Sequence, residues 1–565
     1  MDQERNPVLS KVIDTEGAWI DLFLRMETDK DLYNIKAFQL KNKDGRPTSN
    51  VSNITLNDAS VFASRVLATL NSASMQLVIE GEKIDDNQTA LLEKFFEGIY
   101  LAVDEDLSNN RDIIGLRPFL NEQLCIRGRA VSRILLRTEG KEFIPEILPC
   151  DSRYFTYGLG RYGMRWGAYR TTRSKEELQE EYPAASIRGS VGNVVDVWDD
   201  KVEQVFIDDT LAYEQPNPLG YPPFVVTSCH RGSMLQDADA MSHKAESIFA
   251  GARNLYEHKN RIVSIMYTQH AKLLKAPMQF KNREGARAEP PKYPPYGEGV
   301  VVPIAVDEEY INMPIMDLQQ AGRLLYAIVD SNIQKATLPN VDYGNLTFPL
   351  SAVAISKLTA TRDMVFLPTL QALAIHYRNQ NKMIRKQFIQ GGFRAELGKE
   401  GEKRRFTSAE IKKLEPIFSC KYDITASSPE QDIANYSIAE AAQRWASDDT
   451  ICRDILKQPD PAGEKRQRMV EMAEKVNPFV LQLRIAQALI EEGRDLEAKV
   501  MCRQMGISWR QLKSGKVEPE AKKPQPEQQQ SQGRLPLLGK DRGVMRPPGR
   551  PATPSVEQEA GELPQ

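Results

Sequence analysis

The chain has 565 residues, of which 41% are hydrophobic and 27% charged, and its formal net charge is −3. This length and this apolar share suffice for several packed regions. Proteins that wrap nucleic acid tightly usually carry a large basic surplus, because each neutralised phosphate adds affinity through counterion release. The nearly neutral charge therefore argues against bulk wrapping of DNA.

The six cysteines are scattered, without a CxxC pair and without histidines at zinc-finger spacing. This pattern predicts free thiols rather than a disulfide framework or a structural zinc site. The amino terminus opens on charged residues with no apolar run behind them, so no signal peptide is predicted. No stretch approaches the ~18 apolar residues of a membrane span. We expect a protein that is made and kept in a cytoplasm, or in a particle assembled there.

Residues 1–50 show no sustained periodicity and are interpreted as an arm of uncertain structure. Apolar residues at spacings of three and four then predict helices at about 58–72 and 88–107. A capping box of Ser174 and Glu177 predicts the start of a short helix. Short runs between turn residues predict an α+β domain with antiparallel strands at 130–136, 164–169, 194–198, 204–207 and 224–226.

Long helices are predicted from residue 236 onward. Residues 236–270 contain no proline and place Ile248, Leu255, Ile262 and Met266 on one stripe. A helix of about 35 residues would be roughly 50 Å long. A second helix is predicted at 315–336 and a third at 351–390, in which Pro368 should produce a kink.

The segments between and after these helices differ in composition. The stretch 276–314 is rich in proline and glycine, with a predicted strand at 299–304. Residues 391–427 are basic and mixed, and residues 430–512 are predicted to form a small helical domain. From about residue 516 the composition turns to proline, glutamine, glutamate and lysine, which cannot bury a core and predicts disorder.

One cofactor motif is present, because residues Gly158 to Gly163 spell GxGxxG. A dinucleotide site needs this loop to open a helix, whereas here it leads into the strand-like run 164–169, so we interpret it as a hairpin turn. No GK dipeptide is followed by serine or threonine, and no HExxH pair occurs. The sequence therefore predicts no catalytic residues, no metal and no cofactor.

Two groups of basic residues are candidate binding surfaces. The first lies in the proline-rich stretch, where a solvated loop is the alternative interpretation, and comprises Lys272, Lys275, Lys281, Arg283, Arg287 and Lys292. The second recurs at helical spacing on the third helix, so its members should share a face that could meet phosphate or an acidic neighbour. This second group comprises Arg378, Lys382, Arg385 and Lys386.

The order of elements from 236 to 390 resembles that of portal proteins of tailed bacteriophages, in particular of short-tailed phages. The run Ser356 to Thr361 resembles the Thr-Ala-Thr segment that opens the spine helix of that family, although Arg362 replaces the usual glutamate. The segment Pro216 to Phe224 resembles the family's turn into the last wing strand. The resemblance covers roughly residues 110–512.

The resemblance implies an α+β, portal-like ring subunit with a wing, a helical stem, a small clip and a crown. Its regions would be an N-terminal arm (1–50), an α/β wing (51–235), a descending stem helix (236–270), a clip (271–314), an ascending stem helix (315–337), a tunnel loop (338–350), a spine helix with wing return (351–427), a helical crown (428–515) and a disordered tail (516–565).

A portal protein forms a ring of about twelve copies at one capsid vertex and does no chemistry itself. Double-stranded DNA would pass through its channel during packaging and ejection. The terminase large subunit and then head-tail adaptors would dock at the clip, and scaffolding and major capsid proteins would surround the ring. The expected location is therefore the virion. Alternatives are another virion structural protein, such as an adaptor or internal head protein, and an intracellular enzyme acting on nucleic acid or polysaccharide.

The loop between the second and third helices would lie at the narrowest point of such a channel. Its glycine permits a tight turn, its asparagines tolerate unusual backbone angles, and it has no lysine or arginine to grip phosphate. An ordinary helix–helix connection is the alternative interpretation. The loop consists of Asn340, Val341, Asp342, Tyr343, Gly344 and Asn345.

Overall fold

The computed structural model describes residues 6–80, 86–140, 142–273 apart from 184, 188, 234 and 236, and then 278–281, 309–312, 318–338, 352–399, 403–414, 419–425 and, with short gaps, 436–456 and 468–510. Within these residues the fold is mixed α+β, as the sequence predicts. The chain divides into two compact units, Met1–Val470 and Glu471–Gln565. No helix among the described residues is long and apolar enough to cross a membrane.

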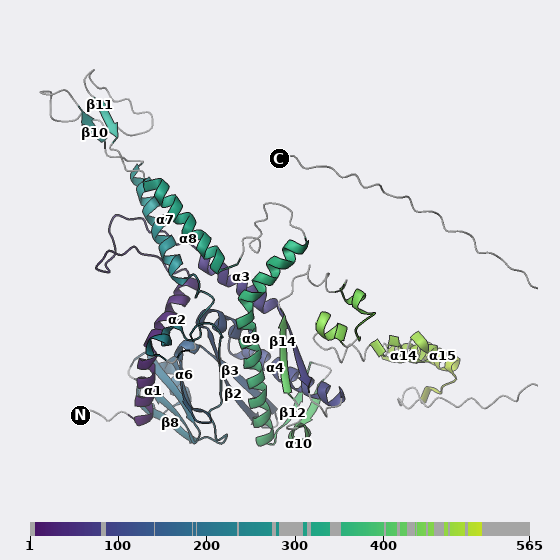
Figure 1. Cartoon of the computed structure of the whole chain (residues 1–565). Helices are drawn as coiled ribbons and strands as arrows, with labels where there is room; N and C mark the ends of the chain where they lie inside the picture. The colour runs from purple at the N-terminus through teal and green to yellow at the C-terminus, as the bar shows by residue number, and fades with distance from the viewer. Residues whose placement is uncertain are drawn as a thin grey trace, which may run out of the picture. The chain divides into compact units, whose positions relative to one another are not determined.

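Two antiparallel sheets form the base of the first unit (Figure 1). A three-stranded sheet has the order β3-β2-β9, and a five-stranded sheet is a meander of β4 to β8. Helix α6 (Lys175–Glu181) leaves β5 through the predicted capping box of Ser174 and Glu177. The strands are β2 (Arg129–Glu139), β3 (Glu142–Cys150), β4 (Phe155–Gly160), β5 (Gly163–Ser174), β6 (Val191–Asp199), β7 (Val202–Ile207), β8 (Thr210–Pro216) and β9 (Phe224–Ser228).

The GxGxxG motif is the turn of the β4–β5 hairpin, which confirms its interpretation as a turn. Gly163 has a φ of +122°, a backbone conformation that glycine adopts without strain. At Gly158 a Cβ would lie 2.2 Å from Nε1 of Trp166, so only glycine leaves room for that ring. Because an antiparallel strand follows the motif instead of a helix, the geometry of a dinucleotide site is absent at this position.

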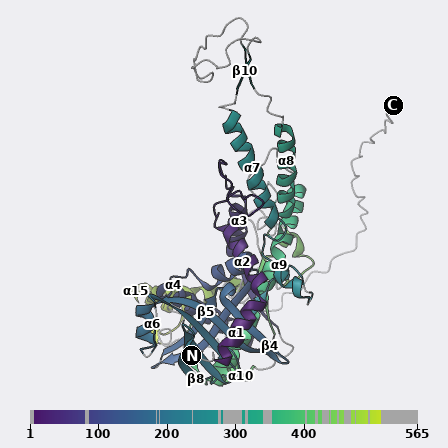
Figure 2. The ribbon, with the colours of Figure 1, turned by 90° about the vertical axis from the view of Figure 1, so that its left-hand side faces the viewer.

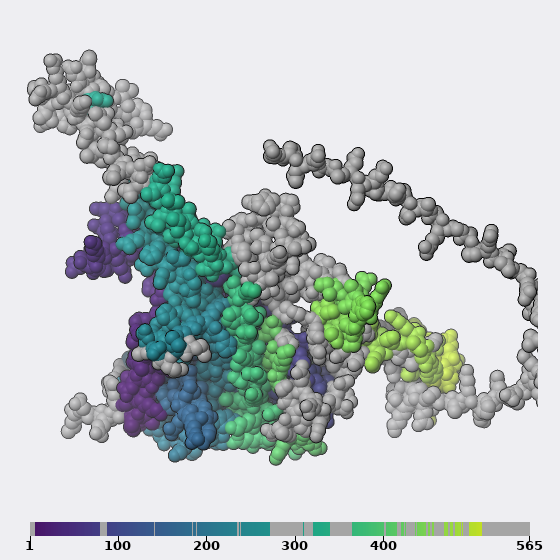
Figure 3. Space-filling view, viewed as in Figure 1, coloured from purple at the N-terminus to yellow at the C-terminus, as the bar shows by residue number. Residues whose placement is uncertain are grey.

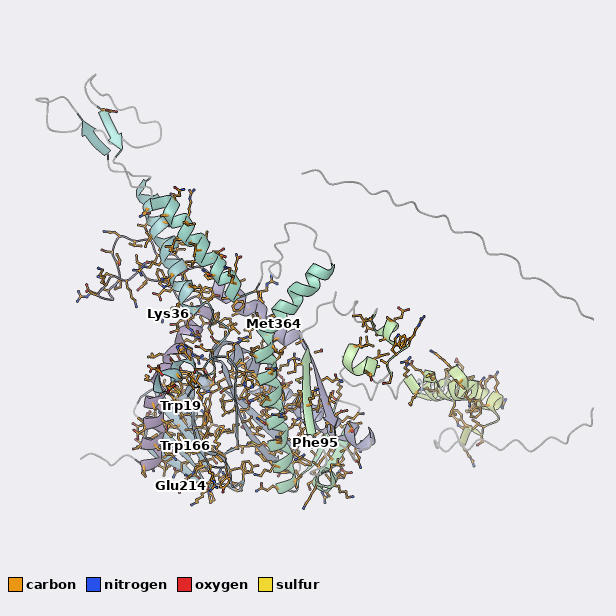
Figure 4. All side chains as sticks on the ribbon, in the orientation of Figure 1. Trp19, Lys36, Phe95, Trp166, Glu214 and Met364 are labelled. Carbon is orange, nitrogen blue, oxygen red and sulfur yellow. The ribbon has the colours of Figure 1, made fainter. Side chains whose placement is uncertain are left out.

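Residues 7–33 are helical and packed, so the interpretation of residues 1–50 as an arm of uncertain structure was wrong for this part. Helix α1 (Pro7–Ala18) begins with an asparagine cap, in which Asn6 accepts a hydrogen bond from the amide of Val8. Its Leu9 and Val12 are buried against the five-stranded sheet. Helix α2 (Ile20–Tyr33) follows directly. Figure 4 shows Trp19, at the junction of the two helices, near this sheet.

The main core of the first unit lies where helices pack against the three-stranded sheet. Phe95 lies in this core, with its ring centroid 4.9 Å from that of Phe388 and 5.4 Å from that of Phe406 in edge-to-face contacts. The elements that build this core are β1 (Ser74–Glu80), α4 (Asp86–Asn110), α5 (Leu116–Glu122) with the π-turn Gln123–Arg127, α9 (Ala352–Gln390), β12 (Arg394–Leu397), β13 (Arg404–Thr407), α10 (Ser408–Lys413) and β14 (Ser419–Thr425).

The predicted third helix is confirmed by α9, which includes Pro368. Figure 1 shows α9 changing direction along its length, as expected for a helix with an internal proline. Strand β14 pairs with β1 in antiparallel register, with Leu77 opposite Tyr422. After α9 the chain therefore pairs with a strand that precedes α4.

A pair of helices extends from the two sheets. Helix α7 (Arg253–Leu273) and helix α8 (Leu318–Ala336) run side by side, and the short hairpin of β10 (Met278–Lys281) and β11 (Glu309–Asn312) lies at their far end (Figures 1 and 2). Helix α8 confirms the second predicted helix. The first was predicted to begin at 236, which is wrong, because Ala238–His243 is a 3-10 turn and the α-helix begins only at Arg253.

In the second unit, helix α14 (Pro478–Glu491) packs against helix α15 (Asp495–Met505). Ala486 and Cys502 are buried between them, and Lys499 lies 5.1 Å from the ring centroid of Trp509. Both helices lie within residues 430–512, which were predicted to be helical. The boundary between the two units falls inside the range 428–515, and the predicted disordered tail and the predicted strand at 299–304 lie outside the described residues.

A polar chain crosses the core between α9 and the three-stranded sheet. Nε2 of His376 lies 2.9 Å from the hydroxyl of Ser132, and Nδ1 lies 3.1 Å from that of Thr227. The amide of Gln380 donates to the Ser132 hydroxyl at 3.1 Å. A neutral imidazole with one donor and one acceptor fits both hydroxyl partners. Complete burial lowers the pKa of His376 to about 3, so the ring stays neutral in the folded protein.

This buried histidine predicts a loss of stability in acid. Below its ordinary pKa of about 6.5 the unfolded chain binds a proton that the folded chain cannot bind. We expect the free energy of unfolding to fall by up to about 1.4 kcal/mol per pH unit from pH 6.5 downward because of this group. Comparison of the protein with His376→Gln by thermal unfolding from pH 7 to pH 4 should show a shallower decline in the variant. Parallel curves would contradict the assignment.

Candidate functional site

The helix pair α7–α8 is the candidate site, because it extends from the sheets and exposes apolar side chains on α8. Gly251, just before α7, lies against Ala336 at the end of α8, and Met266 lies against Gly322 nearer the other end. These two contacts establish that the helices are antiparallel. With 21 and 19 residues they are each roughly 30 Å long, shorter than the roughly 50 Å predicted for the first helix.

The first predicted basic group and the predicted tunnel loop lie mostly outside the described residues. Lys272 falls in the last turn of α7, and Lys281 ends β10 opposite Glu309. Lys275, Arg283, Arg287 and Lys292 lie outside the described part of the chain. The same holds for the whole predicted tunnel loop, Asn340, Val341, Asp342, Tyr343, Gly344 and Asn345.

Helix α8 has two apolar faces. The first is turned toward α7 and includes the buried residues Val329 and Ile333, on a stripe with alternating spacings of three and four residues. The second consists of Leu324, Leu325 and Ile328, whose exposures are 65%, 50% and 49%. Figure 3 shows α8 uncovered on the viewed face. A contiguous exposed apolar stripe on a helix is typical of a surface that binds another protein.

A buried lysine fastens the helix pair to the rest of the unit. The Lys259 ammonium lies 2.8 Å from a carboxylate oxygen of Asp330 on α8 and 3.0 Å from one of Asp58, the first residue of α3 (Asp58–Ser72). Burial alone would lower the pKa of Lys259, but the hydrogen bonds that it donates to the two carboxylates, together with their charges, outweigh burial and raise the pKa. Lys259 therefore stays charged and joins three helices.

Four charged residues hold the base of α7 against α2. Arg253 of α7 forms a bidentate pair with Asp29 of α2, at 2.6 and 3.1 Å, and also donates to Glu246. Arg25 of α2 donates to the same Glu246 at 3.1 Å. Burial alone would raise the pKa of Glu246, but the bonds and charges of Arg253 and Arg25 outweigh it and hold the pKa at about 2. We call these four residues the base network.

A polar stripe on α7 binds an extended segment. The backbone amides of Ser52, Ile54 and Leu56 donate to the side chains of Thr268, Ser264 and Asn260, at 2.9 to 3.0 Å. Two residues of extended chain span about 6.7 Å, and four residues along a helix span about 6 Å. Every second amide of the extended segment therefore reaches a side chain that lies four residues from the previous one along α7. We call residues 51–57 the strap.

The second predicted basic group is only partly brought together. Arg378, Lys382 and Arg385 line one pocket between α9, α4 and β14. Lys386 does not line it, because its ammonium lies 3.5 Å from the ring centroid of Tyr221 on another side of α9. The prediction that all four share one binding face was therefore wrong for Lys386.

Sequence reasoning missed both the base network and the strap. A signal for the strap was present, because Asn260, Ser264 and Thr268 recur every four residues between apolar positions. No comparable signal marks the base network, whose partners lie more than two hundred residues apart in the chain. No known protein-family model matches the chain, and no curated protein matches it.

The base network predicts a large cost for removing one charge. Asp29→Asn leaves a nearly buried guanidinium with one carboxylate fewer, and breaking a buried pair in this way typically costs about 3 to 5 kcal/mol. We expect a fall of about 3 kcal/mol in the free energy of unfolding, measured by denaturant titration. The matched control is Arg173→Ala, which breaks the exposed pair with Glu181 and should cost less than about 1 kcal/mol. Equal effects of the two variants would contradict the role of the network.

The strap predicts local protection of its amides. Ser264→Ala removes the acceptor of the Ile54 amide, and loss of a hydrogen bond worth about 1 kcal/mol should speed exchange roughly fivefold. Hydrogen–deuterium exchange of a peptide that covers the strap measures this change. The control is Ser331→Ala, an exposed serine on α8, which should leave the strap unchanged. Unchanged exchange in both variants would show that side chains of α7 do not hold the strap.

Proposed function

We propose that this chain is the ring-forming portal subunit of a tailed bacteriophage, through which DNA is packaged and ejected. The observation that carries the proposal is the second apolar face of α8, with Leu324, Leu325 and Ile328 exposed on a helix that extends from the sheets. Burial of that face against a further partner would stabilise a helix pair that extends away from the sheets. In the proposed ring, the partner is the stem of the neighbouring copy.

The order of the elements supports the same proposal. An α/β region precedes α7, a small hairpin joins α7 to α8 at the end remote from the sheets, and the long helix α9 leads back to them (Figure 1). In a portal these parts are the wing, the descending stem, the clip, the ascending stem and the spine. The observed shorter α7 keeps this order, because the irregular residues 244–252 connect the wing to the stem.

The chemistry of the core fits a subunit that channels DNA without reacting with it. Ser132 and His376 have the spacing of a nucleophile and a base, yet both are 0% exposed and burial lowers the pKa of the histidine to about 3. A substrate cannot reach that pair, and a base needs a pKa nearer the working pH. The pair serves the packing of α9 on the sheet.

In the proposed ring, partner proteins would bind at the clip and on the outer surface. The terminase large subunit, and later the head-tail adaptors, would dock at the clip around β10 and β11. Scaffolding and major capsid proteins would contact the outer surface of the ring in the virion. DNA would be contacted through its phosphates, and such contacts carry no base specificity.

Purified protein should form closed rings of about twelve subunits, and the exposed face of α8 should be required for them. Leu324→Glu with Ile328→Glu places two charges at the proposed contact between copies, where lost apolar burial and the cost of removing two carboxylates from water both oppose association. We expect the variant to remain folded but monomeric, measured by light scattering after size-exclusion chromatography and by negative-stain microscopy. Folding is checked by the melting curve.

The matched control is Leu159→Glu at the β4–β5 turn, where an exposed leucine is replaced without touching the helix pair. This variant should form rings like the parent protein. A parent protein that remains a monomer at micromolar concentration would overturn the proposed function. Rings formed by the α8 variant would show that copies associate through another surface.

A further inference from the structure

A pocket of about 460 Å³ lies between α9, α4 and β14, away from the α7–α8 pair. Four cationic residues line it: Arg378, Lys382 and Arg385 come from α9, and Lys421 comes from β14. None of the described residues that line it is a carboxylate. The pocket therefore concentrates positive potential in a chain whose formal net charge is −3.

The floor of this pocket is apolar. Phe96, Ala374 and Ile375 contribute to it, and Phe96 is only 1% exposed. The pocket thus combines a cationic rim with a floor suited to an apolar side chain. A ligand that fits both must carry negative charges on either side of an apolar group.

The uncharged polar side chains that line the pocket, Asn381 and Tyr422, are hydrogen-bonded to each other and to Tyr100. The amide of Asn381 donates to the hydroxyl of Tyr422 at 2.6 Å, and the hydroxyl of Tyr100 donates to the Asn381 carbonyl oxygen at 2.6 Å. Burial raises the pKa of the Cys420 thiol to about 11, so it is neutral. A nucleobase edge would meet donors and acceptors that already have partners, whereas an apolar side chain needs none.

We propose that this pocket binds an acidic peptide segment of a partner protein, with an apolar side chain on the floor and carboxylates on the rim. Guanidinium groups bind carboxylates with two parallel hydrogen bonds, and Arg378, which is exposed on α9, can act in this way. The lysines add charge without fixed geometry. The inference extends beyond ring formation, because the pocket uses none of the residues of the helix pair.

The probe is a fluorescently labelled peptide with the sequence Glu-Glu-Leu-Glu-Glu, and its binding to the full-length protein is measured by fluorescence anisotropy. We expect binding that weakens with added salt. Arg378→Gln with Lys382→Gln removes two exposed rim charges and should weaken binding at least about tenfold, equivalent to about 1.4 kcal/mol. The control, Lys386→Gln with Lys413→Gln, removes two charges outside the pocket and should bind within about twofold of the parent.

Two further probes test the class of ligand. A peptide in which glycine replaces the central leucine should bind more weakly, because it leaves the floor uncovered. A single-stranded thymidine oligonucleotide of the same net charge should bind no more tightly than that glycine peptide. Each of three results would overturn the proposal: no binding of the leucine peptide, equal loss in the pocket and control variants, or tighter binding of the oligonucleotide. These outcomes do not depend on whether the protein forms rings.

Discussion

The base network is the constraint on which the arrangement of the helix pair depends. Arg25 and Asp29 lie on α2, whereas Glu246 and Arg253 lie at the point where the chain leaves the sheets and enters α7. All four are largely or fully buried, so removal of one partner leaves the others charged in a medium that solvates them poorly. The helices at the N-terminus therefore support the helix pair α7–α8. The direction of α7 is set by contacts with residues more than two hundred positions earlier in the chain.

The same contacts explain why the first long helix was predicted too long. Arg25 donates to the carbonyl oxygen of Ala245 at 2.9 Å, and the amides of Glu246 and Ile248 donate to the carbonyl oxygens of Arg231 and Cys125. Distant segments thus satisfy the backbone groups that a helix would satisfy internally. Ala245 has a φ of +55°, which a helix excludes. Apolar periodicity reports which side chains are buried, and Ile248 is indeed buried, but periodicity carries no information on these backbone partners.

Local patterns predicted the parts of the fold whose hydrogen bonds are local. Helices α3, α8 and α9 and the hairpin at Gly158 to Gly163 follow from spacing, capping and turn residues. The strap and the pairing of β1 with β14 could not be predicted in this way, because each requires a partner that is far away in the chain. For the basic residues of α9, spacing alone could not predict that Arg385 lines the pocket and the next residue, Lys386, does not. Lys386 contacts Tyr221, whose position depends on the turn before β9.

The strap also bears on how the proposed ring would close. Rings require a heterologous contact, in which a face of one copy meets a different face of the next. On α7 one side packs against α8 and a second side is covered by the strap, which leaves Ile265, 39% exposed, on a third side. On α8 the exposed face is that of Leu324 and Ile328. In the proposed ring, the apolar face of α8 in one copy therefore meets the side of α7 around Ile265 in the next. The strap covers the other open side of α7. The two faces left for contact between copies are therefore the α8 face and the Ile265 side of α7, which differ from each other, as a closed ring requires.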